Sequence, residues 1–193
     1  TLTYITSRSI EGLEGLFTSK RPDLVIVQGD TTTAFTGALA AFYQKIPICH
    51  VEAGLRTGNL FNPYPEEANR RLISQMANYN FAPTKQSAIN LKNENVPGEI
   101  HITGNTVVDA VLTMSKISKN ITKKFKDEGK KIILTTVHRR ENWGANIQEI
   151  CLAINKLIKT FEDIEFIIPM HPNPIVRKTF YEKLEKDSRI KLI

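Results

Sequence analysis

Short apolar runs alternate along the chain with longer segments whose apolar residues recur every three or four positions. The run at 23–29 is apolar on both faces, which is typical of a strand buried in a parallel sheet. Similar runs predict strands at 46–51, 79–82, 99–103, 131–137, 165–170 and 189–193, and the helical pattern predicts helices at 31–43, 65–78, 84–95, 105–118, 146–162 and 174–186. This alternation predicts an α/β protein whose parallel sheets are covered by helices on both faces.

A lysine-rich segment divides this pattern into two parts. From Lys116 to Lys131 the chain has seven Lys and only two acidic residues, so this stretch holds most of the net charge of +6. We therefore predict one domain at 1–118, a linker at 119–130 and a second domain at 131–193. A nucleic-acid surface would interleave its basic residues with aromatic side chains, whereas this segment has only Phe125. A solvated linker or surface helix is favoured, and no nucleic-acid partner is expected.

Length and composition narrow the class of protein further. The 193 residues are 41% hydrophobic and 24% charged, the balance of a globular chain. No apolar run approaches the roughly 20 residues of a membrane span, and no secretory signal is visible. Cys49 and Cys151 lie far apart and outside any CxxC or CxxH spacing, so neither a disulfide framework nor a structural zinc is expected. A reducing compartment fits best, and no membrane partner is expected.

Polar residues follow most of the predicted strands. In open α/β sheets, ligands bind beyond the carboxyl ends of the strands. Those ends carry Asp30, Glu52, Asn105, His138 and His171. Carboxylates and an imidazole over one crevice are the groups that remove and return a proton. Four arginines near these ends are suited to hold a diphosphate by forked hydrogen bonds, namely Arg56, Arg70, Arg139 and Arg140.

Each of these residues also has a purely structural interpretation. Asp30 precedes a predicted helix and would serve as its N-cap, and Glu66 stands in a first helical turn, where the helix dipole favours a carboxylate. His138 and His171 would be buried structural histidines. Glu52 lies between apolar residues, where a charge is costly unless it is used or paired.

Two common nucleotide-binding motifs are absent from the sequence. It has no GxGxxG and no GxxxxGK[ST], which excludes P-loop chemistry. His50 and His101 lie inside predicted strands and are interpreted as structural. Periodicity and spacing thus predict a two-domain α/β protein with acid–base residues at its strand ends, but they name no reaction.

Six short sequence motifs at the strand ends are more specific than periodicity and spacing. They are Gln-Gly-Asp-Thr (28–31), His-Val-Glu-Ala-Gly-Leu-Arg-Thr (50–57), Pro-Glu-Glu-x-Asn-Arg (65–70), Thr-Gly-Asn-Thr-Val-x-Asp (103–109), His-Arg-Arg-Glu-Asn (138–142) and His-Pro-Asn-Pro (171–174). In this order they closely resemble the non-hydrolysing UDP-N-acetylglucosamine 2-epimerases, over essentially the whole chain. The resemblance implies a GT-B-like fold of two Rossmann-like parallel-sheet domains that hold a UDP-sugar in a cleft.

The resemblance also implies a reaction. Enzymes of this family convert UDP-GlcNAc into UDP-ManNAc without a metal ion or nicotinamide. They remove the C2 proton, expel UDP to leave 2-acetamidoglucal, and add UDP back with protonation from the opposite face. The family usually forms homodimers, acts in the cytoplasm and supplies surface polysaccharides.

Site residues are carried over by motif. Asp30, Glu52 and Glu66 would be acid–base groups, and His138 would act near the leaving diphosphate. Arg70, Asn105 and Arg139 would bind or support the substrate, while Glu66, Arg139 and His171 would belong to an allosteric UDP-GlcNAc site.

Sequence motifs that the family resemblance predicts before Thr1 and after Ile193 are missing. The chain is therefore expected to be a central fragment with both domains incomplete, and inactive by itself. Three alternatives stay open from the sequence. The first is a hydrolysing relative that releases ManNAc and UDP, the second an epimerase for another UDP-2-acetamido sugar, and the third an inactive UDP-sugar-binding protein.

Overall fold

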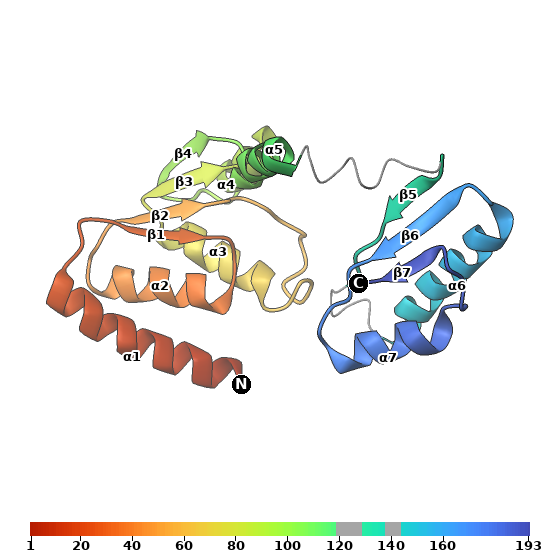
Figure 1. Ribbon diagram of the computed structural model, residues 1–193. Coiled ribbons are helices and arrows are strands. Elements are labelled where there is room, and N and C mark those ends of the chain that lie inside the picture. The colour runs from red at the N-terminus through yellow and green to blue at the C-terminus, as the bar shows by residue number, and fades with distance from the viewer. Residues whose placement is uncertain (119–128, 138–143) are drawn as a thin grey trace. The chain divides into compact units, whose positions relative to one another are not determined.

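The computed structural model describes residues 1–118, 129–137 and 144–193 (Figure 1). The chain forms two compact units, Thr1–Lys116 and Ile117–Ile193. Most of the predicted linker at 119–130 lies outside the described residues, as do His138, Arg139 and Arg140. Each unit is built on its own parallel sheet.

The first unit has a four-stranded parallel sheet in the order β1-β2-β3-β4. The strands are β1 (Val25–Gln28), β2 (Ile48–Val51), β3 (Tyr79–Ala82) and β4 (Glu99–Ile102). The helices are α1 (Leu2–Lys20), α2 (Thr32–Tyr43), α3 (Glu66–Met76), α4 (Lys85–Asn93) and α5 (Thr106–Ile117). Helix α1 was not predicted, because Gly12 and Gly15 interrupt a weak apolar pattern.

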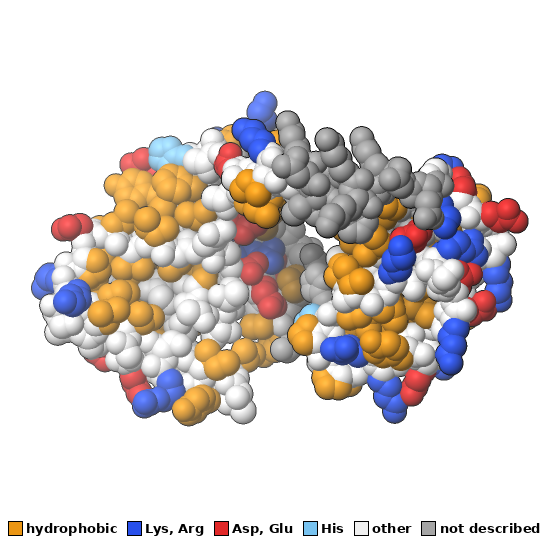
Figure 2. Space-filling view, viewed as in Figure 1, with side chains coloured by type: hydrophobic (Ala, Val, Ile, Leu, Met, Phe, Trp, Pro, Cys, Tyr) orange, Lys and Arg blue, Asp and Glu red, His pale blue; other side chains and the backbone are white. Residues whose placement is uncertain are grey.

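The core of this unit lies between the sheet and α2, α3 and α4. Val27 and Ile48 pack with Ala38 of α2 and Ile73 of α3 in one cluster. Among the described residues the helices cover one face of this sheet, and Ile26 on the other face is 65% exposed. Right-handed crossovers between strands that pair in sequence order place every connecting helix on the same face. Figure 2 shows hydrophobic side chains exposed over these strands.

One glycine lets the segment after β2 pack closely against α4. Gly54 has a φ of 87°, and a Cβ there would lie 2.3 Å from the Ser87 carbonyl oxygen. No other residue fits this conformation and contact. Glycine at 54 therefore sets the path of the chain immediately after Glu52.

The second unit has a three-stranded parallel sheet in the order β5-β6-β7. Its strands are β5 (Lys131–Leu134), β6 (Ile164–Ile168) and β7 (Ile190–Leu192), and its helices are α6 (Ala145–Thr160) and α7 (Pro174–Lys183). Ile147 and Cys151 of α6 pack with Phe166 of β6 and Phe180 of α7. Burial raises the pKa of the Cys151 thiol to about 11, so this cysteine is a neutral core residue.

The described residues contain neither a membrane-spanning helix nor a cluster of metal-ligating side chains. No helix in these parts of the chain is long and apolar enough to cross a bilayer. Nor do three or more of their His, Cys, Asp and Glu side chains gather in a way that suits a metal ion.

Candidate active site

Asp30 follows β1 and is held by helix α3. Its Oδ2 lies 2.6 Å from Nη2 of Arg70, and its carbonyl oxygen accepts a hydrogen bond of 2.9 Å from Nδ2 of Asn69. Asp30 is not the N-cap of α2. Thr31 has that role, and its Oγ1 accepts from the Ala34 amide at 3.1 Å. The interpretation of Asp30 as the N-cap of α2 is therefore wrong, and its carboxylate forms an ion pair with Arg70 instead.

Glu52 follows β2 and has a left-handed backbone with a φ of 67°. A residue with a Cβ adopts this region at a cost of about 1–3 kcal/mol, and such residues gather at functional sites. Its Oε1 accepts a hydrogen bond of 3.1 Å from Nδ2 of Asn105, which lies beyond the end of β4. Asn105 in turn is fixed by the Val107 amide, which donates to its Oδ1 at 2.9 Å.

The ends of β1 and β2 place Asp30 and Glu52 on neighbouring strands of the sheet. A Cβ built on Gly29, directly before Asp30, would lie 3.8 Å from Oε2 of Glu52. The structure thus brings three of the predicted site residues, Asp30, Glu52 and Asn105, to the carboxyl end of one sheet. Arg70 joins them from α3.

His50 is buried beside this end of the sheet. Its Nε2 donates to the Gly29 carbonyl oxygen at 2.9 Å, and its Nδ1 has no hydrogen-bond partner among the described residues. Burial lowers the pKa of His50, so the ring is neutral at neutral pH. These contacts agree with a structural role. His101, by contrast, lies exposed on β4 beside Glu99.

Helix α3 begins with two carboxylates that lie in different surroundings. Glu66, a predicted acid–base group, is half-buried in the first turn. Glu67, which the sequence analysis did not single out, is fully buried. Its Oε2 accepts from the Thr57 amide at 3.1 Å, and the same oxygen lies 3.6 Å from Nη1 of Arg70. A carboxylate with arginines three and four positions later is the signal that would have drawn attention to it.

Arg56 does not have the predicted role. Its Nε and Nη2 donate to the two carboxylate oxygens of Glu94 at 2.9 and 2.6 Å, and its side chain is 8% exposed. The hydrogen bond from Arg56 holds the pKa of Glu94 below its usual value. This forked pair occupies the guanidinium, so the expectation that Arg56 holds a diphosphate is corrected.

In the second unit, His171 follows β6. Its Nδ1 accepts from the Asn173 amide at 3.1 Å, and Asn173 is the N-cap of α7 through its Oδ1, which accepts from the Ile175 amide at 2.9 Å. His171 therefore stands half-buried at a strand end, as predicted from its position. The other predicted residues of this unit, His138 and Arg139, lie outside the described residues.

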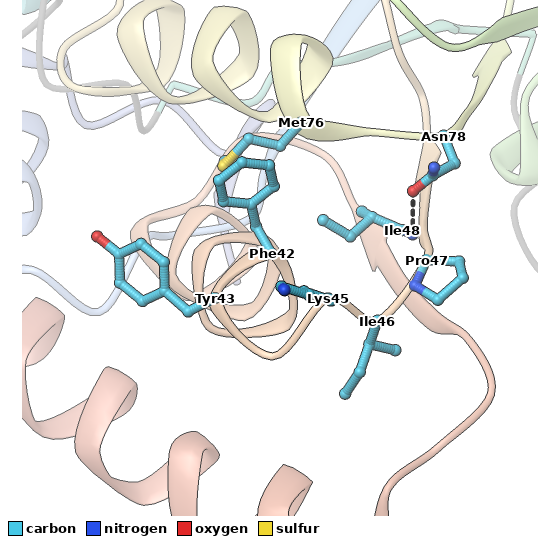
Figure 3. Close-up of a pocket in the computed structure, with 8 residues that line it drawn as sticks. All are labelled: Phe42, Tyr43, Lys45, Ile46, Pro47, Ile48, Met76 and Asn78. Carbon is cyan, nitrogen blue, oxygen red and sulfur yellow. Dashed lines mark hydrogen bonds between the residues drawn. The ribbon is translucent and has the colours of Figure 1, made fainter.

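A pocket of about 490 Å³ lies at the opposite, amino end of the first sheet (Figure 3). The described residues that line it are Phe42, Tyr43, Lys45, Ile46, Pro47, Ile48, Met76 and Asn78. Asn78 closes its wall, with its Oδ1 accepting from the Ile48 amide at 2.9 Å. This lining has no carboxylate and no imidazole, so it offers no pair of groups for proton transfer.

Comparison with known proteins decides the family. The sequence model of the family described as UDP-N-acetylglucosamine 2-epimerase matches residues 1–193. The chain belongs to this family. The UDP-N-acetylglucosamine 2-epimerase of Escherichia coli K12 is 48% identical over 189 residues, which cover 92% of this chain and 50% of the relative.

Solved structures of epimerases share the fold. The Neisseria meningitidis UDP-GlcNAc 2-epimerase bound to UDP-GlcNAc has a TM-score of 0.92 and 46% identity, and the match covers all of this chain and 54% of that one. The Staphylococcus aureus MnaA–UDP structure has a TM-score of 0.90 and 44% identity, with 100% and 53% coverage. The predicted α/β class with two Rossmann-like, GT-B-like units is confirmed, and the chain spans about half the length of these epimerases.

Proposed function

We propose that the whole protein interconverts UDP-GlcNAc and UDP-ManNAc without hydrolysis. One carboxylate accepts the proton from C2, the electrons of the C2–H bond form a C1=C2 double bond, and UDP leaves with the electrons of the C1–O bond. UDP then adds back to C1 of 2-acetamidoglucal while a proton reaches C2 from the other face. Each step of this scheme transfers a proton or the UDP group and none transfers a hydride, and the proposal includes neither a nicotinamide nor a metal ion.

The observation that carries this proposal is the pair of carboxylates at neighbouring strand ends. Asp30 is held by Arg70 and Glu52 by Asn105, through side chains that arrive from α3 and from beyond β4. Inversion at C2 needs a base on one face of the sugar and an acid on the other, and two separately held carboxylates meet that need. Proton transfer by positioned groups contributes about 10²–10⁴-fold to such a rate.

The remaining roles rest on the motifs. We propose Glu66 as a third acid–base group, His138 near the leaving diphosphate, and Arg139 as a substrate contact. The motifs also carry the proposal of a second, allosteric UDP-GlcNAc site that uses Glu66, Arg139 and His171. A homodimer and a cytoplasmic location, where UDP-sugars serve polysaccharide synthesis, complete the proposal.

Proton NMR of UDP-GlcNAc with the whole protein in D2O tests the function. We expect UDP-ManNAc to form with deuterium at C2. Free ManNAc with an equal amount of UDP would instead identify a hydrolysing enzyme. Unchanged UDP-GlcNAc, with UDP still raising the melting temperature, would identify a protein that binds the nucleotide without catalysis.

A further inference from the structure

Glu67 is a fully buried carboxylate without an acid–base role in the proposed reaction. It lies in the first turn of α3, and its oxygens accept hydrogen bonds from the Thr57 and Gly58 amides at 3.1 and 3.4 Å. Two arginines of the same helix lie beside it, since Nη1 of Arg70 and Nε of Arg71 are each 3.6 Å from its carboxylate. Glu67 therefore joins the segment after β2 to two cations on α3.

Arg70 is the group through which Glu67 reaches the candidate site. Its Nη2 lies 2.6 Å from Asp30, while its Nη1 faces Glu67. Its Nε has no hydrogen-bond partner among the described residues, so these two carboxylates set the direction of the guanidinium. If the Glu67 carboxylate is removed, the guanidinium of Arg70 can rotate about its remaining contact with Asp30.

A contribution to folding stability does not readily explain a buried carboxylate at position 67. Burying an ionised group costs several kcal/mol, and a buried ion pair repays little more than that cost. Replacing Glu67 and its two arginines together by apolar residues would avoid this cost, whereas replacing Glu67 alone would leave the Thr57 and Gly58 amides and both guanidinium groups without their acceptor. A charged residue at position 67 is better explained by what it does to its neighbours.

We propose that Glu67 is a positioning residue, which fixes Arg70 so that Arg70 in turn orients Asp30. This inference rests on the proposed function, because Asp30 is the acid–base group that it concerns. Glu67 itself does not reach the substrate in this account. It acts through one arginine, and that dependence makes the inference testable.

Glu94 supplies a matched control. It is also held by two arginines, Arg56 at 2.6 Å and Arg71 at 3.1 Å, but it does not contact Arg70. Glu67→Gln and Glu94→Gln thus remove the same charge from the same ion-pair cluster. Both variants are expected to unfold at lower temperature, whereas only the first disturbs Arg70.

The test is a double-mutant cycle on kcat and KM of the whole protein with UDP-GlcNAc. We expect Glu67→Gln to lower kcat about 10- to 100-fold with KM little changed, because misplacing a reacting group by an ångström has this effect. Glu94→Gln should leave kcat near that of the unmodified enzyme. In an Arg70→Lys background, Glu67→Gln should lose most of its effect, since both changes disturb the same contact.

Several outcomes would overturn the inference. Equal kcat losses in Glu67→Gln and Glu94→Gln, or a full additional loss in the Arg70→Lys background, would reduce Glu67 to a structural residue. If Glu67→Gln does not fold, Glu67→Asp replaces it in the cycle, with a smaller kcat loss and the same non-additivity expected. An unmodified whole protein without epimerase activity would overturn the proposed function, and this inference with it.

Discussion

The two ends of the first sheet differ in their chemistry although the same strands and helices build both. The carboxyl end holds Asp30, Glu52 and Arg70 in fixed contacts, whereas the amino end holds an apolar pocket around Phe42 and Met76. Helices α2 and α3 begin near the first end and finish at the second. Their N-termini carry partial positive charge, which favours an anionic ligand at the carboxyl end.

This comparison teaches that the presence of a pocket does not by itself locate the acid–base groups of a parallel sheet. Of the described residues that line the amino-end pocket, only Lys45 and Tyr43 have titratable side chains. Proton transfer needs groups that are both titratable and held in place. The direction of the strands, which the sequence pattern already predicts, points to the end that carries Asp30 and Glu52.

The largest expected effect is the loss of kcat when a carboxylate at the carboxyl end of the sheet is replaced. Asp30→Asn and Glu52→Gln should each lower kcat for UDP-GlcNAc epimerisation about 10²–10⁴-fold, because each removes one proton-transfer group. Initial rates of UDP-ManNAc formation by the whole protein measure this loss. Asp23→Asn, at the exposed amino-terminal approach to β1, is the matched control and should leave the rate unchanged. Full activity in both site variants would contradict the assignment.

A smaller effect is expected where a neutral group supports a carboxylate. Removing the Asn105 donor should lower kcat about 10- to 100-fold, because a hydrogen bond to a charged group contributes about 1.5–3 kcal/mol. Asn105→Asp keeps the oxygen that accepts from Val107, whereas Asn105→Ala loses this contact as well. Both variants should lose activity and melt at lower temperature, Asn105→Asp because it puts a second carboxylate beside Glu52 and Asn105→Ala because it loses the contact with Val107. Wild-type kcat in Asn105→Asp would show that the contact with Glu52 has no role.

The next effect concerns stability and pH. Glu94→Gln should lower the free energy of unfolding by about 1–2 kcal/mol at neutral pH, since Glu94 loses its charge beside Arg56. The pKa of Glu94 is lowered in the folded state, so its stabilisation is present above the usual value of 4.5 and disappears as the pH falls through the lowered pKa.

Urea unfolding of the unmodified protein and of Glu94→Gln over this pH range measures the difference. The two should converge in acid, while Glu99→Gln, an exposed carboxylate beside His101, should differ little from the unmodified protein at any pH. A gap for Glu94→Gln that does not change with pH would contradict the electrostatic cause.

The smallest effect belongs to the amino-end pocket. Phe42 and Tyr43 are 53% and 63% exposed, so Phe42→Ser and Tyr43→Ser should change the free energy of unfolding by about 0.5 kcal/mol or less. Their kcat and KM should match those of the unmodified enzyme. A large loss of kcat in either variant would place this pocket in the reaction machinery and remove the contrast between the two ends.

Much of the fold could be predicted from the sequence because its signals are local. The run at 23–29 and the helical pattern after Thr31 fixed β1 and α2, and the position of Asp30 at a strand end followed from them. Helix α1 was missed because its apolar pattern is weak. Coverage of only one face by helices depends on strand order, which no local pattern encodes.

The candidate site, like the fold, could be predicted from the sequence only in part. Strand ends located Asp30, Glu52 and Asn105, but not the contacts that hold them. The capture of Arg56 by Glu94 joins residues 38 positions apart, and the burial of Glu67 depends on the amides of Thr57 and Gly58. Such long-range pairings decide whether an arginine is free for a ligand, and spacing along the chain does not reveal them.

The most direct test of the account is the transfer of deuterium from D2O to C2 of UDP-GlcNAc, followed by proton NMR in the unmodified protein, Asp30→Asn and Glu52→Gln. The account predicts deuterium at C2 with the unmodified protein, and a large loss of exchange in both variants while UDP still raises their melting temperatures. Exchange at the unmodified rate in both variants would show that the proton is moved elsewhere, and the central claim would be wrong.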